Sequence, residues 1–153
     1  LIALIGESIR LWSLRYAGSA TCTTGEVGAD VLVTDGPYGH LRNPLYLGNF
    51  LLSFGILIMA WPWMPWLMVI FLLLFYVQYR AIISLEEEFL RNKFGAQYGE
   101  YEENVPSVFP RLTSWGRGER APTTLKKALR TERNSLQSFT AVTILILLRW
   151  LVR

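Results

Sequence analysis

The stretch from Asp30 to Gly48, DVLVTDGPYGHLRNPLYLG, passes from a polar, turn-rich loop directly into a long apolar segment. Gly36-Pro37 is a turn signal, and Pro44 suits the first turn of a helix because its missing N–H would be unpaired there anyway. Between the two prolines lies the densest group of side-chain donors in the first half of the chain, His40, Arg42 and Asn43. A polar loop at the mouth of an apolar helix predicts a ligand site.

The apolar segment is one of several blocks long enough to cross a bilayer. A membrane-spanning helix needs roughly 17–20 apolar residues, and Leu45–Trp61, Trp66–Leu85 and Leu136–Val152 meet that length. Leu1–Gly18 is a fourth candidate, for which an amphipathic surface helix is the alternative. In the run WPWMPW at 61–66, two prolines break the helix and the tryptophans mark a membrane interface. This run predicts a tight hairpin whose outer ends return to the same membrane surface.

Composition supports this organisation. The chain has 153 residues, which favours one domain covering 1–153, and 52% of them are hydrophobic and gathered in blocks rather than spread periodically. Basic residues concentrate between Arg80 and Arg133, which places that segment on the cytoplasmic side, while interleaved acids argue against a nucleic-acid partner. The single Cys22 and single histidine exclude an internal disulfide and an all-Cys/His zinc site, and no metal is predicted.

These observations together predict an all-α integral membrane protein. We expect four to five transmembrane helices with a cap on the cytoplasmic side that binds a cofactor. The helix that begins at Trp66 should continue beyond Glu86 to about Lys93, where Gly95 ends it. Acidic runs such as Glu86-Glu87-Glu88 are usually solvated. Consecutive helical residues point about 100° apart, so at most two of these three can face inward.

A series of motifs, in a fixed order, carries a family resemblance. They are Val33-Thr34-x-Gly36-x-Tyr38, Arg42-Asn43-Pro44-x-Tyr46-x-Gly48, Glu86-Glu87, Phe94-Gly95-x-x-Tyr98-x-x-Tyr101 and Val105-Pro106. This order resembles the isoprenylcysteine carboxyl methyltransferase and phospholipid methyltransferase family, whose members are integral membrane enzymes that use S-adenosylmethionine. The resemblance covers the motif region 30–111, about half of the chain.

The resemblance implies a cofactor site for S-adenosylmethionine and, as product, S-adenosylhomocysteine. Its predicted residues are Asp30, Val31, Leu32, Val33, Tyr38, His40, Asn43, Pro44, Leu45, Tyr46, Gly48 and Glu86. Asn43 stands where the family usually has histidine, and an amide can bind but cannot carry a proton at neutral pH. Gly48 would let the cofactor or a neighbouring helix approach the backbone. The isoprenylcysteine enzymes keep a substrate-contacting arginine where this chain has Ile82, which argues against a prenylcysteine acceptor but leaves the cofactor prediction unaffected.

Three residues are predicted to act on the acceptor or the reacting groups. Arg42 offers a planar fork that matches a carboxylate of cofactor or substrate, with an arginine at the membrane boundary as the alternative. Glu87 could take a proton from the nucleophile, and Arg80 could hold a carboxylate or phosphate of the substrate. Tyr38 and Tyr46 could present their rings to adenine or to the sulfonium, or be ordinary interfacial tyrosines.

The resulting hypothesis is methyl transfer from S-adenosylmethionine to a lipid-like or prenylated acceptor, a carboxylate or an amine. The reaction would take place at the cytoplasmic face of a bacterial or archaeal inner membrane, with the bilayer as partner. Two alternatives remain: an NADPH-dependent enzyme like the sterol and steroid reductases, which share a related R-x-P-x-Y-x-G segment, and a non-catalytic helical membrane subunit. The sequence leaves the acceptor and the oligomeric state open.

Overall fold

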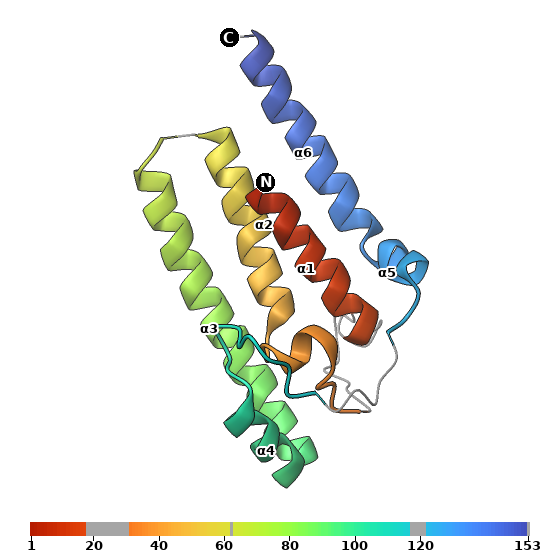
Figure 1. Cartoon of the computed structure of the whole chain (residues 1–153). Helices are drawn as coiled ribbons and strands as arrows, with labels where there is room; N and C mark the ends of the chain where they lie inside the picture. The colour runs from red at the N-terminus through yellow and green to blue at the C-terminus, as the bar shows by residue number, and fades with distance from the viewer. Residues whose placement is uncertain (18–30, 62, 117–121, 153) are drawn as a thin grey trace.

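The computed structural model describes residues 1–17, 31–61, 63–116 and 122–152, and helices are the only regular secondary structure in these ranges. In chain order they are α1 (Ile2–Ala17), the short 3-10 helix η2 (Gly36–Gly39), α2 (Pro44–Ala60), α3 (Trp66–Phe94), α4 (Ala96–Asn104), α5 (Leu125–Thr131) and α6 (Arg133–Val152) (Figure 1). The all-α prediction is confirmed. The predicted site residue Asp30 lies outside the described residues, as does Gly18 at the end of the first candidate span.

The predicted hairpin between the two central apolar helices is confirmed. Helix α2 ends at Ala60 and is followed by Trp61, which adopts a left-handed conformation. Helix α3 starts at Trp66 and runs back antiparallel to α2 (Figure 1). Helix α3 continues to Phe94 and ends at Gly95, whose φ of 51° favours glycine. The start of α2 and the last two turns of α3 therefore lie at the same end of the molecule, opposite the tryptophan turn.

Small residues allow α1 to pack closely along α2. A Cβ on Gly6 would lie 2.7 Å from the Gly48 carbonyl oxygen, and one on Gly55 would lie 2.8 Å from the Cα of Ala3. No side chain fits at such distances, so the two backbones approach as they do in small-residue interfaces between membrane helices. This packing fixes the position of the loop that precedes α2.

Within the described ranges, two helices are long and apolar enough to cross a membrane, α3 and α6, and α2 is a shorter apolar helix of 17 residues. In the apolar window of α3 no residue is buried inside the protein, and in that of α6 only 6% are. Apolar side chains that point outward along a whole helix are the arrangement expected of helices in contact with lipid.

Beyond the helical hairpin, α4 folds back to build a small cap with its own core. Tyr98, Tyr101 and Val105 are buried there, each at most 2% exposed, and Leu32 and Trp115 pack against them. The Tyr101 hydroxyl donates a hydrogen bond of 2.8 Å to a backbone carbonyl of η2. Burial raises the pKa of Tyr101, so its hydroxyl stays protonated and can donate.

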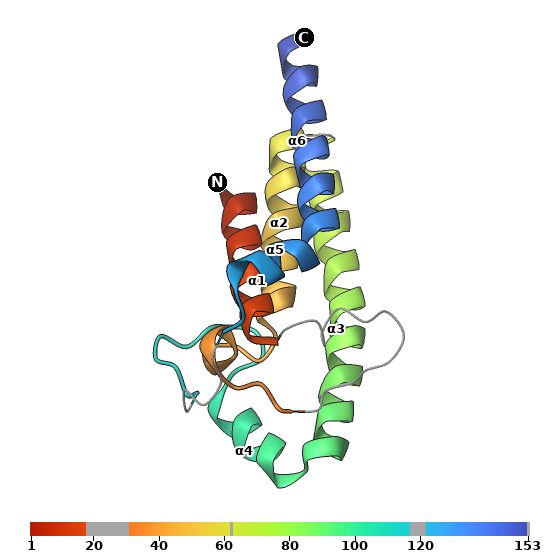
Figure 2. The same cartoon turned by 90° about the vertical axis from the view of Figure 1, so that its right-hand side faces the viewer.

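The chain after α4 runs beside the loop that leads into α2 (Figure 2). Backbone hydrogen bonds join Arg42 N to the Pro106 carbonyl at 2.9 Å and Arg111 N to the His40 carbonyl at 3.0 Å. A third joins Trp115 N to the carbonyl of Gly39 at 3.0 Å. Two segments distant in sequence thus hold each other in register, and both carry predicted site residues or motifs.

An ion pair connects the C-terminal helices to α1. Arg10 on α1 donates from Nη2 to both carboxylate oxygens of Glu132, at 2.7 and 2.8 Å, and its Nε lies 3.8 Å from Glu7. Glu132 stands between α5 and α6, so the pair fixes the start of α6 against α1.

Candidate functional site

The centre of the candidate site is Arg42, on the loop between η2 and α2. Its Nε lies 3.1 Å from Glu87 Oε1 and its Nη2 lies 3.4 Å from Glu87 Oε2, so the guanidinium fork faces a carboxylate of α3. Its Nη1 donates to the Glu102 carbonyl at 2.9 Å. The predicted meeting of the two motif halves is confirmed by these hydrogen bonds. The carboxylate that the Arg42 fork holds here belongs to the protein itself.

Two neutral side chains, Asn43 and Ser107, also donate hydrogen bonds to the Glu87 carboxylate. Asn43 Nδ2 donates to Glu87 Oε1 at 3.1 Å and to Ser107 Oγ at 3.0 Å, and the Ser107 hydroxyl donates in turn to Glu87 Oε1 at 3.1 Å. One carboxylate oxygen therefore accepts three hydrogen bonds, including the one from Arg42. Sequence reasoning missed Ser107. Its place directly after the Val105-Pro106 motif is the signal that could have identified it.

A second ion pair extends the cluster toward solvent. Arg91 donates to both carboxylate oxygens of Glu102, at 2.9 and 2.8 Å, and its Nη2 lies 4.0 Å from Glu87. The hydrogen bond from Arg91, with the nearby charge of Arg42, holds the pKa of Glu102 below its ordinary value. Neither Arg91 nor Glu102 was predicted, although the spacing of Glu87 and Arg91, four residues apart on one helix, is the spacing of an ion pair.

Glu86 faces a different set of partners. Its carboxylate faces the hydroxyl of Tyr46, in the first turn of α2. The Tyr46 ring meets the Tyr79 ring edge-on at 4.9 Å, and the Tyr79 hydroxyl accepts a hydrogen bond of 3.1 Å from Asn49. The predicted site residues Tyr46 and Glu86 are thus brought together, and Tyr79 and Asn49 hold Tyr46 in place.

The charges of this cluster do not cancel. Three glutamates, Glu86, Glu87 and Glu102, stand against two arginines, Arg42 and Arg91, which leaves one formal negative charge in excess. Glu86, half-buried beside the Tyr46 ring, is the glutamate of this cluster that forms no ion pair with a described arginine. A carboxylate next to an aromatic ring is a favourable environment for a ligand that carries positive charge.

The other predicted residues differ in their surroundings and in how far they are buried. Leu32 packs on the core of the cap, and Tyr38 is buried, with its carbonyl bound by Tyr101. Pro44 is the buried first residue of α2, and Leu45 follows it half-buried. Val33 is half-buried in the segment before η2, whereas Val31 is 59% exposed.

Three predicted residues lie outside the hydrogen-bonded cluster of Arg42 and Glu87. His40 Nδ1 lies 2.9 Å from the Arg111 carbonyl oxygen, and the imidazole ring lies 6.0 Å from that of Trp12. Gly48 faces α1, since a Cβ there would lie 2.9 Å from the Gly6 carbonyl. Arg80 is exposed on α3 and forms no ion pair with another described residue.

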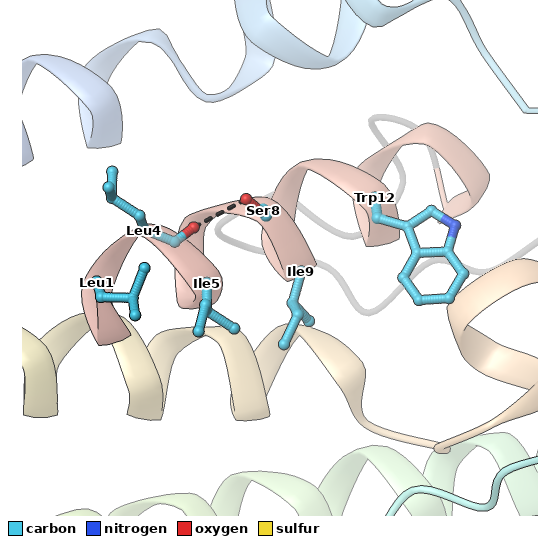
Figure 3. Close-up of a pocket in the computed structure, with 6 residues that line it drawn as sticks. All are labelled: Leu1, Leu4, Ile5, Ser8, Ile9 and Trp12. Carbon is cyan, nitrogen blue, oxygen red and sulfur yellow. Dashed lines mark hydrogen bonds between the residues drawn. The ribbon is translucent and has the colours of Figure 1, made fainter.

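A separate groove runs along α1, with a volume of about 390 Å³ (Figure 3). Its lining is almost entirely apolar and consists of Leu1, Leu4, Ile5, Ser8, Ile9 and Trp12. The Ser8 hydroxyl, its only polar side chain besides the indole N–H, already donates to the Leu4 carbonyl at 2.8 Å. None of the predicted site residues lines this groove.

Comparison with known proteins gives a consistent set of relatives. The sequence model of the phospholipid methyltransferase family matches residues 1–97. The cobalt-zinc-cadmium resistance protein CzcN of Cupriavidus metallidurans is 33% identical over 122 residues, covering 77% of this chain and 51% of the relative. Protein-S-isoprenylcysteine O-methyltransferase A of Arabidopsis thaliana is 32% identical over 113 residues, covering 72% of this chain and 56% of the relative.

A second metal-resistance protein, the nickel-cobalt-cadmium resistance protein NccN of Alcaligenes xylosoxydans xylosoxydans, is 34% identical over 104 residues, covering 68% of this chain and 44% of the relative. The chain spans about half the length of these curated relatives. No solved structure matches it. Among the residues that the structure describes, no three His, Cys, Asp or Glu side chains are arranged to hold a metal ion.

Proposed function

This chain belongs to the phospholipid methyltransferase family, and we propose that it transfers a methyl group from S-adenosylmethionine to a lipid-like or prenylated acceptor. One observation carries the proposal. At one end of the α2–α3 hairpin, the unpaired carboxylate of Glu86 stands beside the closed cluster of Arg42, Asn43 and Glu87. A charged, partly buried site at the end of apolar helices suits a polar cofactor and an acceptor drawn from the membrane.

The charge of the site favours this cofactor over the alternative. S-adenosylmethionine carries one net positive charge at neutral pH, which complements the excess negative charge of the cluster. NADPH carries several negative charges, and the two arginines of the cluster are already paired with Glu87 and Glu102. A dinucleotide phosphate would therefore have to displace a protein carboxylate, at the cost of breaking an existing ion pair.

Each residue of the site has a proposed role toward the cofactor. Glu86 accepts hydrogen bonds from the ribose hydroxyls or from the ammonium group, and Tyr46 orients the Glu86 carboxylate from the opposite helix. The cofactor supplies a methyl group already activated by its sulfonium, so most of the rate can come from positioning. The hydrogen bonds of Asn43 and Ser107 to Glu87 keep the loop before α2 rigid for that purpose.

The surroundings of Glu87 bear on the acceptor. Its Oε1 already accepts three hydrogen bonds, so only Oε2, which lies 3.4 Å from Arg42 Nη2, has room for a contact with the acceptor. We therefore favour an acceptor that needs little help from a base, namely a carboxylate or an amine with a lowered pKa. Arg80, exposed on α3 ahead of Glu86, would orient the polar end of such an acceptor.

A line of aromatic contacts offers a place for the apolar tail of the acceptor. Between α2 and α3, the Phe50 ring lies 5.1 Å from that of Phe75, which stacks on Tyr79 at 4.0 Å, and Tyr79 contacts Tyr46. The line thus leads from the hydrocarbon-facing part of the hairpin to Glu86. We propose that the acceptor enters sideways along this line of rings, from the bilayer. We also propose that the protein has four to five membrane helices, and that their basic ends, which carry the motifs, face the cytoplasm.

Calorimetry separates the candidate functions. The purified protein, titrated with S-adenosylhomocysteine and with NADPH, should bind the first and not the second. Binding of NADPH alone would support the reductase alternative, and binding of neither would support a non-catalytic subunit. Transfer of a labelled methyl group to lipid acids, amines and alcohols with the same tail then tests the acceptor. A preference for the alcohol, with a fully active Glu87→Gln variant, would show that the proposed acceptor chemistry is wrong.

A further inference from the structure

The segment after α4 exposes large apolar side chains beside the candidate site. Val108 is 63% exposed, Phe109 is 81% exposed and Leu112 is 99% exposed. All three belong to a loop, outside the helices that the apolar blocks of the sequence predict to cross the membrane. Ser107, the residue before them, is hydrogen-bonded to Glu87 at the centre of the site. We call Val108, Phe109 and Leu112 the apolar tip of this loop, and its exposure beside the site indicates that it contacts a partner.

Hydrogen bonds on both sides hold the tip outward. Before it, the Pro106 carbonyl accepts from Arg42 N at 2.9 Å and Ser107 is bound to the site. After it, Arg111 N donates to the His40 carbonyl at 3.0 Å and Arg111 Nη1 donates to the Asn104 carbonyl at 2.6 Å. The apolar side chains cannot turn inward without breaking bonds that also position the site. The hydrogen bonds of the loop therefore fix the exposure of these side chains.

The position of the tip relative to the apolar helices, and the charge next to it, indicate what it contacts. Arg42, whose backbone N–H binds the Pro106 carbonyl just before the tip, lies two residues before Pro44, where the apolar helix α2 begins. In both views the loop lies level with the C-terminal end of α1 and the start of α2. Helix α4 lies farther than the loop from the turn between α2 and α3 (Figures 1 and 2). The tip also carries one cation, Arg111, at a position where lipid phosphates would complement its charge.

We propose that Val108, Phe109 and Leu112 insert into the boundary between lipid headgroups and acyl chains, and that this loop attaches the site to the bilayer surface. Apolar side chains flanked by a basic residue are the pattern of segments that lie in a membrane interface. Because Ser107 connects the tip directly to Glu87, insertion would set the depth of the site in the membrane. The inference rests on the membrane-spanning part of the proposed function.

Depth-dependent quenching tests the inference. In a Cys22→Ser background, single cysteines replace Phe109 on the tip, Leu73 on the apolar face of α3 (62% exposed) and Glu103 on the exposed face of α4. Each is labelled with a polarity-sensitive fluorophore in nanodiscs of phosphatidylcholine and phosphatidylglycerol. Lipids with a shallow or a deep nitroxide, and iodide in the water, serve as quenchers. A label at Leu112 repeats the measurement if the Phe109 variant fails to fold.

At Phe109 we expect a roughly twofold loss of fluorescence with the shallow nitroxide and little effect of iodide, since interfacial segments lie about 5–10 Å into the headgroup boundary. Leu73 should respond to the deep nitroxide and Glu103 to iodide. Quenching of Phe109 by iodide alone would place the tip in water and overturn the inference. Protection of Phe109 from iodide and from both nitroxides would overturn it in favour of a protein partner, and quenching by the deep nitroxide alone would overturn it in favour of burial in the hydrocarbon. Failure of the Leu73 control would instead refute the membrane-spanning proposal itself.

Discussion

Replacing Glu86 by glutamine is the sharpest test of the candidate cofactor site. The change keeps the size of the side chain and its place beside Tyr46, but it removes the charge that no arginine of the cluster neutralises. Glu88 provides a matched control, because Glu88→Gln makes the same change two residues further along the same helix, at an exposed position. Any general effect of net charge on binding is therefore common to both variants.

The size of the effect follows from the contacts assigned to Glu86. Hydrogen bonds to a charged group contribute about 1.5–3 kcal/mol, and each 1.4 kcal/mol corresponds to about tenfold in affinity. Glu86→Gln should therefore weaken the binding of S-adenosylhomocysteine by about 10-fold to 150-fold. Glu88→Gln should leave the dissociation constant unchanged within about twofold. A Tyr46→Phe variant should give a smaller loss, because the Glu86 carboxylate remains but is no longer oriented.

The measurement is titration calorimetry of each purified variant with S-adenosylhomocysteine, accompanied by thermal unfolding to establish that the variant is folded. A folded Glu86→Gln protein that binds as tightly as the parent would remove Glu86 from the site. An equal loss in Glu86→Gln and Glu88→Gln would show that the binding depends on overall charge and not on the place that Glu86 occupies beside Tyr46.

Three further predictions concern packing, pH and topology. Gly55→Leu should lower the melting temperature in detergent, because a Cβ there would lie 2.8 Å from the Cα of Ala3 on α1 and overpacking costs about 1–3 kcal/mol. An unchanged melting temperature would contradict the close packing. The hydrogen bond from Arg91 lowers the pKa of Glu102 from 4.5, so its stabilisation is present above pH 4.5 and is lost as the pH falls through the folded-state value. Glu102→Gln should therefore flatten the acid side of the profile of melting temperature against pH, and an unaltered profile would exclude the pair as its source. Cysteines at Thr34 and Asn104 should both be labelled from the cytoplasmic side of sealed vesicles, and labelling from opposite sides would refute the proposed topology.

The sequence predicted that the two parts of the candidate site would meet, but not which of its side chains bind each other. The order of the motifs predicted that the loop around Arg42 and the acidic run on α3 would meet, and the hydrogen bonds confirm it. The sequence did not indicate that Glu87 would occupy the Arg42 fork, or that Ser107 would bind the same carboxylate oxygen. Three neighbouring glutamates look alike in a sequence, and the rotation of α3 about its axis decides which partner each one faces.

The sequence by itself determined where the long apolar helices run, the start of α2 and the end of α3, because these depend on local chemistry. Apolar blocks of sufficient length, Pro44 at a helix start and Gly95 at a helix end act within a few residues of their own positions. The tertiary structure alone decided the use of Gly48, which packs α2 on α1, and of His40, which lies against the Arg111 carbonyl. Those contacts join segments separated by tens of residues. Whether a donor or a small residue meets a ligand or another part of the chain therefore depends on how the helices pack.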